Sequence, residues 1–462
     1  MTKKALLITG QESETISTLA QNLIHVGGLS LFARQMKQMK AIGVNEMHVI
    51  TDWFVQDFEK EILSCPARPE RIFIHATKDA PLRLLEHNSE GNCWLLIQEA
   101  VLLDDRIIAQ TLRHPASTVI SFIGQNEFLS AHTANGLPLH LGENEGFFGG
   151  IAKLSSQTLS ANVRKLNNLE GLPSVLKAIA KTEGPRTEEP KTKECAIAKV
   201  TEIPLLLTRE RRDVDLIWFP LSRREDGDTA TNILLEHSQK GLLDWPAKFL
   251  HRPIENLIVK YLCKFPISPN QITIMNGLLG FYALFLFASG HMWPALLLAY
   301  IVGILAGVDG KLARVKILQS RIGRYEYILT GLIEYGWYFA LAAALYDPFG
   351  LAPLIMAAAL VLFQIADHIQ TEFFRRMTNR PLFSLAAFDR RFQLIAGGRN
   401  NHMWALLPFA LFNQWFMALG FICSYGIITF FVHQIRLVYH LKNIMIDGSE
   451  NFAENVNKTK SP

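Results

Sequence analysis

Ala306–Arg314 reads A-G-V-D-G-K-L-A-R, and eight residues later Gly323–Gly331 reads G-R-Y-E-Y-I-L-T-G. Long apolar runs flank both pieces, so Asp309, Lys311 and Arg314 stand where one apolar segment ends and the next begins. Ionisable side chains at membrane depth are costly, and they mark functional sites by default. The stretch therefore predicts a helical membrane domain with a polar site at the membrane surface.

Composition divides the chain into two halves. Its 462 residues are enough for two domains or more. Charged and apolar residues alternate up to about residue 264, whereas 270–441 consists mainly of long apolar runs. The net charge of +4 gives no reason to expect a nucleic-acid partner. The five cysteines are scattered without a C-x-x-C pair, which argues against a disulfide framework or a zinc site.

Six apolar segments in the second half are each close to the ~20 residues needed to cross a bilayer. The turns after the first, third and fifth segments contain no Lys or Arg, whereas the loops after the second and fourth are strongly basic. By the positive-inside rule we expect an integral protein of the cytoplasmic (inner) membrane, with the N-terminal domain and the C-terminus in the cytoplasm. The segments cover 268–289, 292–311, 322–346, 351–371, 402–418 and 420–440.

The first half alternates strand-like and helix-like patterns. Short apolar runs at 5–9, 47–51, 71–75, 94–98 and 118–122 are separated by helical patterns at 31–42 and 107–112. This order predicts an α/β domain with a largely parallel sheet.

Four parts are expected along the chain. Residues 1–240 form the α/β domain, 267–445 an all-α domain of six transmembrane helices, and 446–462 a disordered tail. Between the two domains, 241–266 combines a helical apolar period with interspersed Lys and Arg. This pattern predicts an amphipathic helix lying on the membrane surface, with a connector helix packed on the soluble domain as the alternative.

The stretch quoted above resembles the motif of the CDP-alcohol phosphotransferase family, which is D-x-x-D-G-x-x-A-R, eight residues, then G-x-x-x-D-x-x-x-D. Five positions match, and we take them as candidate substrate-binding residues: Asp309, Gly310, Ala313, Arg314 and Gly323. The resemblance implies six transmembrane helices and transfer of a substituted phosphate from a CDP-alcohol to an acceptor alcohol, as in phospholipid or inositol-phosphate synthesis. It also implies a CDP-alcohol or lipid ligand and a homodimer.

Three of the four carboxylates in that motif are missing. The first acid position holds Ala306, the third Tyr327 and the fourth Gly331. In the full motif four carboxylates on two helices hold Mg²⁺ or Mn²⁺, and the last is given the role of general base. Asp309 alone cannot build a two-metal cage, so we expect the catalytic metal site to be largely lost.

Other acids near the motif are candidates for holding a metal with Asp309. Glu326 adjoins Tyr327, and Glu334 lies three residues beyond Gly331 on the same helix face. Their alternative roles are an interfacial acid for Glu326 and a buried structural pair for Glu334.

Basic residues near the motif are candidates for phosphate binding. Lys311 could hold phosphate in place of a cation, or it could be an interfacial lysine. Arg390, Arg391 and Arg399 precede the fifth apolar segment and are candidates for a second phosphate. Ordinary anchoring by positive charge is the alternative for all three arginines.

The first half looks like a sugar-nucleotidyltransferase domain, chiefly at Leu31–Thr51. The loop expected to be a Gly-rich phosphate cradle is Gly10–Thr15, which has one glycine and two acids. Glu99 follows Gln98 where a metal-binding Gly-Asp is expected, and Asp215 lies in the region of the second metal aspartate. Glu99 and Asp215 are therefore candidates for a shared cation.

The order of the two domains resembles bifunctional enzymes that make CDP-inositol and then transfer it to a second inositol phosphate. Two hypotheses remain open: an active transferase with altered metal use, or a pseudoenzyme that binds a nucleotide, a lipid or a partner enzyme. Loss of acids in both halves favours the pseudoenzyme. A transporter has little support, because the motif accounts better for the polar residues.

Overall fold

The computed structural model describes residues 3–9, 21–124, 137–141, 144–163, 176, 179, 195–203, 206–207, 212–239, 241, 243–318, 323–378 and 380–458. Only the backbone is described for 140–141, 144, 195, 206–207, 212–213, 323–329 and 446–458. The chain divides into two compact units. Unit 1 comprises 1–205, 214–237 and 315–317, and unit 2 comprises 206–213, 238–314 and 318–462.

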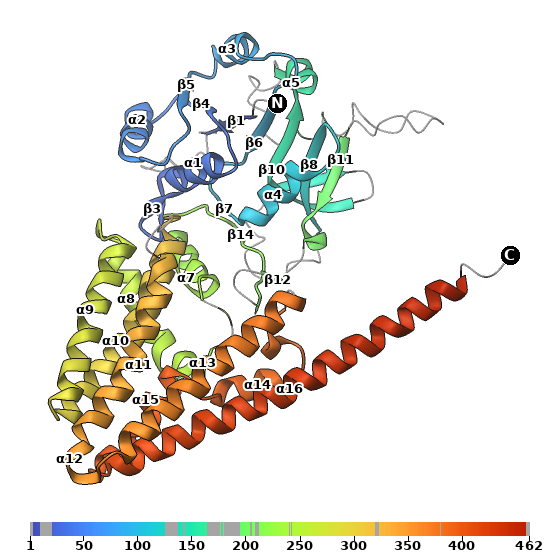
Figure 1. Cartoon of the computed structure of the whole chain (residues 1–462). Coiled ribbons are helices and arrows are strands. Elements are labelled where there is room, and N and C mark those ends of the chain that lie inside the picture. The colour runs from blue at the N-terminus through green and yellow to red at the C-terminus, as the bar shows by residue number, and fades with distance from the viewer. Residues whose placement is uncertain are drawn as a thin grey trace. The chain divides into compact units, whose positions relative to one another are not determined.

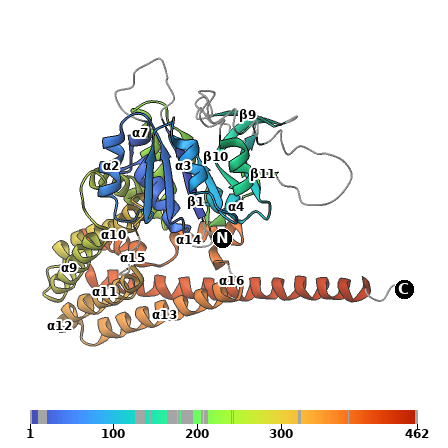
Figure 2. The same cartoon turned by 90° about the horizontal axis from the view of Figure 1, so that it is seen from above.

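Unit 1 is built on an eight-stranded mixed sheet (Figure 1). Within it, β9 pairs with β10 off the main path of strands (Figure 2). The path of the other strands is β11-β8-β10-β6-β1-β4-β5. Their bounds are β1 Lys3–Ile8, β4 Glu46–Ile50, β5 Arg71–His75, β6 Cys93–Ile97, β8 Thr118–Gly124, β9 Pro138–Leu141, β10 Asn144–Ser155 and β11 Cys195–Lys199. β5, β4, β1 and β6 are mutually parallel, as predicted, whereas β10 runs antiparallel to both β6 and β8. The expected α/β class is confirmed, and the sheet is mixed rather than largely parallel.

The helices described in unit 1 alternate with its strands, and the first three connect the parallel strands β1, β4, β5 and β6. They are α1 (Leu31–Ala41), α2 (Val55–Ser64), α3 (Ala80–Glu86), α4 (Asp105–Arg113), α5 (Ser156–Asn162) and α7 (Asp226–His237). Ser30 caps α1 through a bond from Ala33 N–H, and Asp104 caps α4 through Arg106 N–H. Ladders outside the sheet join β2 (His25–Val26) to β3 (Leu29–Ser30) and β7 (Val101–Leu103) to β14 (Trp218–Pro220). Buried aliphatic and aromatic side chains of the strands and α1 form the main core.

Unit 2 is a bundle of long apolar helices. The helices described in unit 2 are the π-helical turn η5 (Ala247–His251), α8 (Arg252–Leu262), α9 (Pro269–Ala288), α10 (Met292–Val315), α11 (Gly323–Ala344), α12 (Tyr346–Phe349), α13 (Ala352–Thr378), α14 (Ala387–Ile395), α15 (Arg399–Leu411) and α16 (Trp415–Lys458). Shorter elements are the hairpin β12 (Leu206–Leu207) and β13 (Arg212–Asp213), and the 3₁₀ turns η1 (Gln21–Leu23) and η4 (Val200–Glu202) of unit 1 and η6 (Leu382–Ser384) of unit 2. α13 and α16 pack lengthwise (Figure 2).

Four helices in the described part of the chain are long and apolar enough to cross a membrane: Pro269–Ala288, Met292–Val315, Ala352–Thr378 and Trp415–Met445. The other two predicted spans correspond to α11 and α15. α15 has 13 residues, or about 20 Å of helix, which is shorter than the ~30 Å hydrocarbon core. The four long helices support a membrane protein, and the count of six spans stays a prediction.

Two segments singled out in the sequence, 241–266 and the tail from residue 446, are helical in the structure. The 241–266 segment folds as η5 and α8, and it exposes the apolar side chains of Phe249, Ile254, Leu257, Tyr261 and Phe265. The disordered tail predicted from residue 446 differs from the structure, because α16 continues as helix to Lys458. No proline interrupts those residues, and adding a turn to an existing helix avoids the cost of nucleation.

Candidate functional site

Asp309 of the motif is tied to the helix before it. A capping box of Ser268 and Gln271 begins α9 and fixes its first turns. One turn on, the Thr273 hydroxyl donates to Asp309 Oδ2 at 2.6 Å, while Gly310 N–H donates to Oδ1 at 2.6 Å. Asp309 is 4% exposed. Both carboxylate oxygens thus have a partner inside the protein, as a buried acid requires.

Lys311 turns away into a buried ion pair with α8. Its Nζ lies 2.9 Å from Glu255 Oε2 and donates to Asn256 Oδ1 at 2.6 Å. The Lys311 and Glu255 side chains are 1% and 4% exposed, so the pair is almost dry. Gly307 makes room for it, because a Cβ there would lie 2.3 Å from the Glu255 carboxylate. Burial raises the pKa of Glu255, and the Lys311 ammonium opposes that rise.

Arg314 follows one turn after Gly310 and lies over it. A Cβ on Gly310 would lie 3.5 Å from the Arg314 guanidinium, which is an ordinary van der Waals distance, so this contact does not require a glycine. Arg314 Nε donates to the carbonyl oxygen of Ser238 at 2.6 Å, and the side chain stays partly exposed. Ala313 is also partly exposed. Gly323 opens α11, and the side chains of its first turns lie outside the described residues.

The residues described around Asp309 do not fit a divalent metal. No three His, Cys, Asp or Glu side chains gather to hold an ion anywhere in the described ranges. A magnesium site needs about six oxygen ligands in octahedral geometry, and here the motif offers one carboxylate. The Glu326 side chain lies outside the described residues. Glu334 is engaged elsewhere, because the Tyr338 hydroxyl donates to its Oε1 at 3.3 Å.

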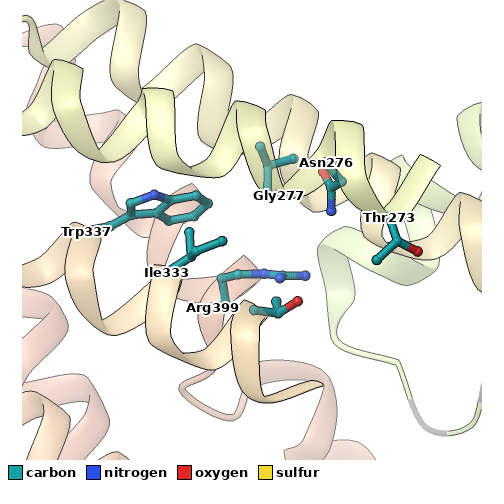
Figure 3. A pocket seen from close by; sticks show the side chains of 8 residues that line it. Thr273, Asn276, Gly277, Ile333, Trp337 and Arg399 are labelled. Carbon is teal, nitrogen blue, oxygen red and sulfur yellow. The ribbon is translucent and has the colours of Figure 1, made fainter. Parts of the chain in front are cut away.

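A small pocket opens beside Thr273 (Figure 3). Its polar lining comes from Thr273, Asn276, Thr330 and Arg399. Figure 3 shows Thr273 and Asn276 along one helix, the Arg399 side chain reaching beneath them, and the Trp337 ring at the other end. Val302, Ile333 and Trp337 supply apolar walls.

Arg399 is the one predicted second-phosphate arginine that reaches this pocket. Its Nε donates to Asn400 Oδ1 at 3.4 Å, and Asn400 Nδ2 donates to Asp244 Oδ2 at 2.9 Å. The Arg399 guanidinium also acts electrostatically on Asp244 and on Glu334. Burial raises the pKa of Asp244, against hydrogen bonds from Ala247 and Asn400. Arg399 is therefore linked to the Asp244 carboxylate through Asn400.

Arg390 and Arg391 lie apart from the pocket, exposed on α14. That helix is fixed by Asp389, which accepts from Arg436 Nε at 2.5 Å and lies 2.6 Å from His440 Nε2. Burial acts to raise the pKa of Asp389, but these two partners hold it below its usual range. The structure does not bring Arg390 and Arg391 together with Arg399 at the pocket.

In unit 1 the two candidate cation ligands lie at opposite ends of one ladder. Glu99 precedes β7, whose Val101 pairs with Pro220, whereas Asp215 precedes β14, whose Trp218 pairs with Leu103. The β7–β14 pairing therefore separates Glu99 from Asp215. The Asp215 carbonyl instead accepts from Arg106 Nη2 at 2.9 Å. The loop Gly10–Thr15, which stands where the sequence comparison expects a Gly-rich phosphate-binding loop, lies outside the described residues.

Several residues at this site carried no signal in the sequence. Glu255, Asn256, Asp244 and Asn276 come from segments outside the motif, and only packing brings them to α10 or the pocket. Two glycines of α10 offered one clue to this packing. Gly303 and Gly307 stand four residues apart, and small residues at that spacing permit the close approach of another helix.

Residues 266–326 match the family model described as CDP-alcohol phosphatidyltransferase. The match lies within the C-terminal part of the chain and is confined to this segment. The match covers α9, α10 and the first turn of α11, which are the elements that hold Asp309, Gly310, Ala313 and Arg314. The resemblance drawn from the motif is confirmed for this part of the chain.

One curated relative is a protein of Thermococcus kodakarensis named bifunctional IPC transferase and DIPP synthase. The two are 24% identical over 236 residues, which are 49% of this chain and 53% of that protein. The chain thus spans about half the length of the curated relative it matches.

Solved structures show distant likenesses. The inositol-1-phosphate CTP transferase from T. maritima is 10% identical, and the match covers 50% of this chain and 96% of that chain at a TM-score of 0.35. HddC from Yersinia pseudotuberculosis complexed with GMP-PN is 10% identical, with 50% and 99% covered at a TM-score of 0.34. The α/β class of unit 1 rests on its own strand order.

Proposed function

We propose that this membrane protein binds a CDP-linked alcohol, or a lipid phosphate of like chemistry, at the end of α10 without the family's two-metal transfer step. The observation that carries the proposal is the state of Asp309, whose two oxygens accept from Thr273 and Gly310. Arg314 follows on the same helix and is partly exposed, and its guanidinium is the kind of group best suited to bind phosphate oxygens.

Lys311 supports the loss of the metal step. Its ammonium is committed to Glu255 and Asn256 and is 1% exposed, so it does not line an open phosphate site. The positions of the other three motif acids carry Ala306, Tyr327 and Gly331. On this proposal Mg²⁺ or Mn²⁺ is dispensable for binding. The protein then acts as a pseudoenzyme, which binds a nucleotide, a lipid or a partner enzyme at the membrane without catalysing transfer.

The proposal includes a setting for the site. We place the protein in the inner membrane, with unit 1 and the ends of the chain in the cytoplasm, because the basic loops stand on that side by the positive-inside rule. CDP-linked compounds would then approach Arg314 from the cytoplasm. Unit 1 is proposed as a nucleotidyltransferase-like domain that no longer transfers nucleotide, and the family resemblance implies a homodimer.

The experiment uses the full chain in lipid nanodiscs with a panel of radiolabelled CDP-alcohols and acceptor alcohols. We expect no CMP release above the protein-free level with Mg²⁺ or Mn²⁺. We also expect CDP to bind with the same affinity in the presence of a chelator. Arg314→Ala should weaken CDP binding about tenfold or more, since a charge-assisted hydrogen bond contributes about 1.5–3 kcal/mol.

The matched control is Arg376→Ala, which removes an exposed arginine at the end of α13 and should leave CDP binding unchanged. CMP release that requires metal and disappears in Asp309→Ala would overturn the proposal in favour of an active transferase. Unchanged CDP binding in Arg314→Ala would remove Arg314 from the site.

A further inference from the structure

Helix α14 is fastened to the bundle by one of its faces. Asp389, which is 4% exposed, accepts from Arg436 Nε of α16 at 2.5 Å, and its Oδ2 lies 2.6 Å from His440 Nε2. The Phe392 ring packs edge to face on the His433 ring of α16, with 5.4 Å between the ring centres. Asp389 and Phe392 are three residues apart and share a helix face. That face of α14 is therefore the one that docks on α16 (Figure 1).

The remainder of α14 carries two arginines and two large apolar side chains. Arg390 and Arg391 are exposed, and Phe388 and Ile395 are 53% and 55% exposed. Arg390 Nη1 donates to the Ser384 carbonyl at 3.1 Å, which is a neutral partner. Neither arginine forms an ion pair with any residue that the structure describes. Both positive charges are therefore available to an anionic ligand.

The arginines at the end of α13 differ from this pair. Arg375 Nε donates to Glu372 Oε2 at 2.7 Å, and Arg376 Nε donates to Glu372 Oε1 at 3.0 Å. One carboxylate thus offsets part of their charge. The uncompensated charge at this end of the bundle is on α14.

The partner of α14 on α16 fixes the depth at which the helix lies. Arg436 stands 21 residues after Trp415, where the long apolar stretch of α16 begins. At 1.5 Å per residue this is about 31 Å, close to the ~30 Å thickness of the hydrocarbon core. The rings of Phe388 and Tyr439 lie 5.3 and 4.7 Å from the Arg436 guanidinium. Tyr439 is 50% exposed, and tyrosine is enriched at the membrane interface. These positions put α14 at the level of the lipid headgroups.

The exposed side chains suit a bilayer that carries negative charge. A guanidinium binds phosphate oxygens in pairs of hydrogen bonds, and an anionic headgroup has no cation of its own to oppose that contact. Phe388 and Ile395 lie on one flank of the helix, where they can enter the boundary between headgroups and acyl chains. A soluble acidic protein would meet the same arginines, but it would leave these two apolar side chains uncovered.

We propose that the outward side of α14 is a binding surface for anionic phospholipids. Arg390 and Arg391 hold the headgroup phosphates, and Phe388 and Ile395 lie among the upper acyl carbons. Positive charge that only sets membrane topology needs no lipid contact, whereas this surface selects one class of lipid. The inference goes beyond the proposed function and does not depend on it, because α14 carries no residue of the Asp309–Arg314 motif.

The test titrates the full chain in detergent with phosphatidylglycerol and with phosphatidylcholine of the same acyl chains, and native mass spectrometry gives the two affinities. The wild-type protein should prefer phosphatidylglycerol. Arg390→Gln combined with Arg391→Gln should lower that preference about fivefold for each arginine removed. Phe388→Ser combined with Ile395→Ser should weaken both lipids about tenfold and leave their ratio unchanged, since it removes apolar contact and no charge.

The matched control is Arg223→Gln combined with Arg224→Gln. These are two adjacent exposed arginines that precede α7, and the acids Glu225 and Asp226 follow them. The control removes the same charge and should leave the lipid preference unchanged. Equal affinities of the wild-type protein for the two lipids would overturn the inference. So would a preference that survives the loss of Arg390 and Arg391, or one that falls equally in the control.

Discussion

The Thr273 hydroxyl donates a 2.6 Å hydrogen bond to Asp309 Oδ2, and this bond joins α9 to α10 at the motif. Thr273 stands one turn into α9, and Asp309 stands near the end of α10. With Gly310 N–H on the other oxygen, the carboxylate has a fixed orientation. Asp309 therefore connects two helices through its hydrogen bonds.

Removing the Thr273 hydroxyl should destabilise unit 2. Thr273→Val keeps the volume but leaves Asp309 Oδ2 buried without a donor, so we expect a loss of about 1–3 kcal/mol. The loss is measured by unfolding of the full chain in detergent. Thr273→Ser retains a hydroxyl and should recover most of it. Equal stability of the valine and serine variants would contradict a role for this hydrogen bond.

The buried pair of Lys311 and Glu255 should show strong coupling. Glu255→Gln leaves the Lys311 ammonium without its counter-charge and should cost about 3–5 kcal/mol. Lys311→Met combined with Glu255→Gln removes both charges and should cost much less than the sum of the single variants. Denaturation of the four proteins of this cycle gives the coupling energy.

An exposed pair supplies the comparison for that cycle. Lys40 and Glu70 lie 3.3 Å apart on the surface of unit 1, with side chains 37% and 68% exposed. The same pair of substitutions there should give a coupling of at most about 1 kcal/mol. Equal coupling at the two sites would mean that the Lys311–Glu255 pair is not buried as described.

Gly307 should not tolerate a methyl group. A Cβ at Gly307 would lie 2.3 Å from the Glu255 carboxylate, so Gly307→Ala should push α8 away and destabilise by about 1–3 kcal/mol. Gly331→Ala is the matched control, because no atom of the described residues lies within 4 Å of its Cβ position on α11. There the better helix propensity of alanine should stabilise by up to about 1 kcal/mol. A stabilising Gly307→Ala would refute the close packing of α8 on α10.

Unit 1 should lose stability in mild acid because of His48. Burial lowers the pKa of His48 from 6.5 to about 4, against the hydrogen bond to Glu46 at 3.0 Å. Between pH 6.5 and 4 the unfolded chain therefore takes up a proton that folded His48 does not, and stability falls as pH decreases, by up to about 3 kcal/mol. His75, 2.9 Å from His48, has its pKa lowered by burial and acts in the same direction.

The measurement is thermal unfolding of the full chain between pH 7 and 4.5. His48→Gln should flatten the dependence on pH. His251 of unit 2 also has a pKa lowered to about 4 by burial, so some dependence should remain in that variant. An unchanged slope in His48→Gln would show that this buried histidine does not titrate with unfolding.

The sequence by itself determined the class of both halves. Alternating short apolar runs indicated the α/β unit because strands and helices differ in period, and long apolar runs indicated the membrane helices because a bilayer demands ~20 residues. Asp309, Gly310, Ala313 and Arg314 stand at the spacing of a known family motif, and this resemblance indicated the family. Local signals of this kind depend only on neighbours along the chain.

The tertiary structure alone decided what surrounds the motif. Glu255 reaches Lys311 from 56 residues before it, and Thr273 reaches Asp309 from 36 residues before it. Asp244 is linked through Asn400 to Arg399, which lies 155 residues further along the chain. Such pairings follow from how helices pack against one another. The period of apolar residues in one helix does not predict which other helix it contacts. The sequence named the motif, and packing decided which groups bind its side chains.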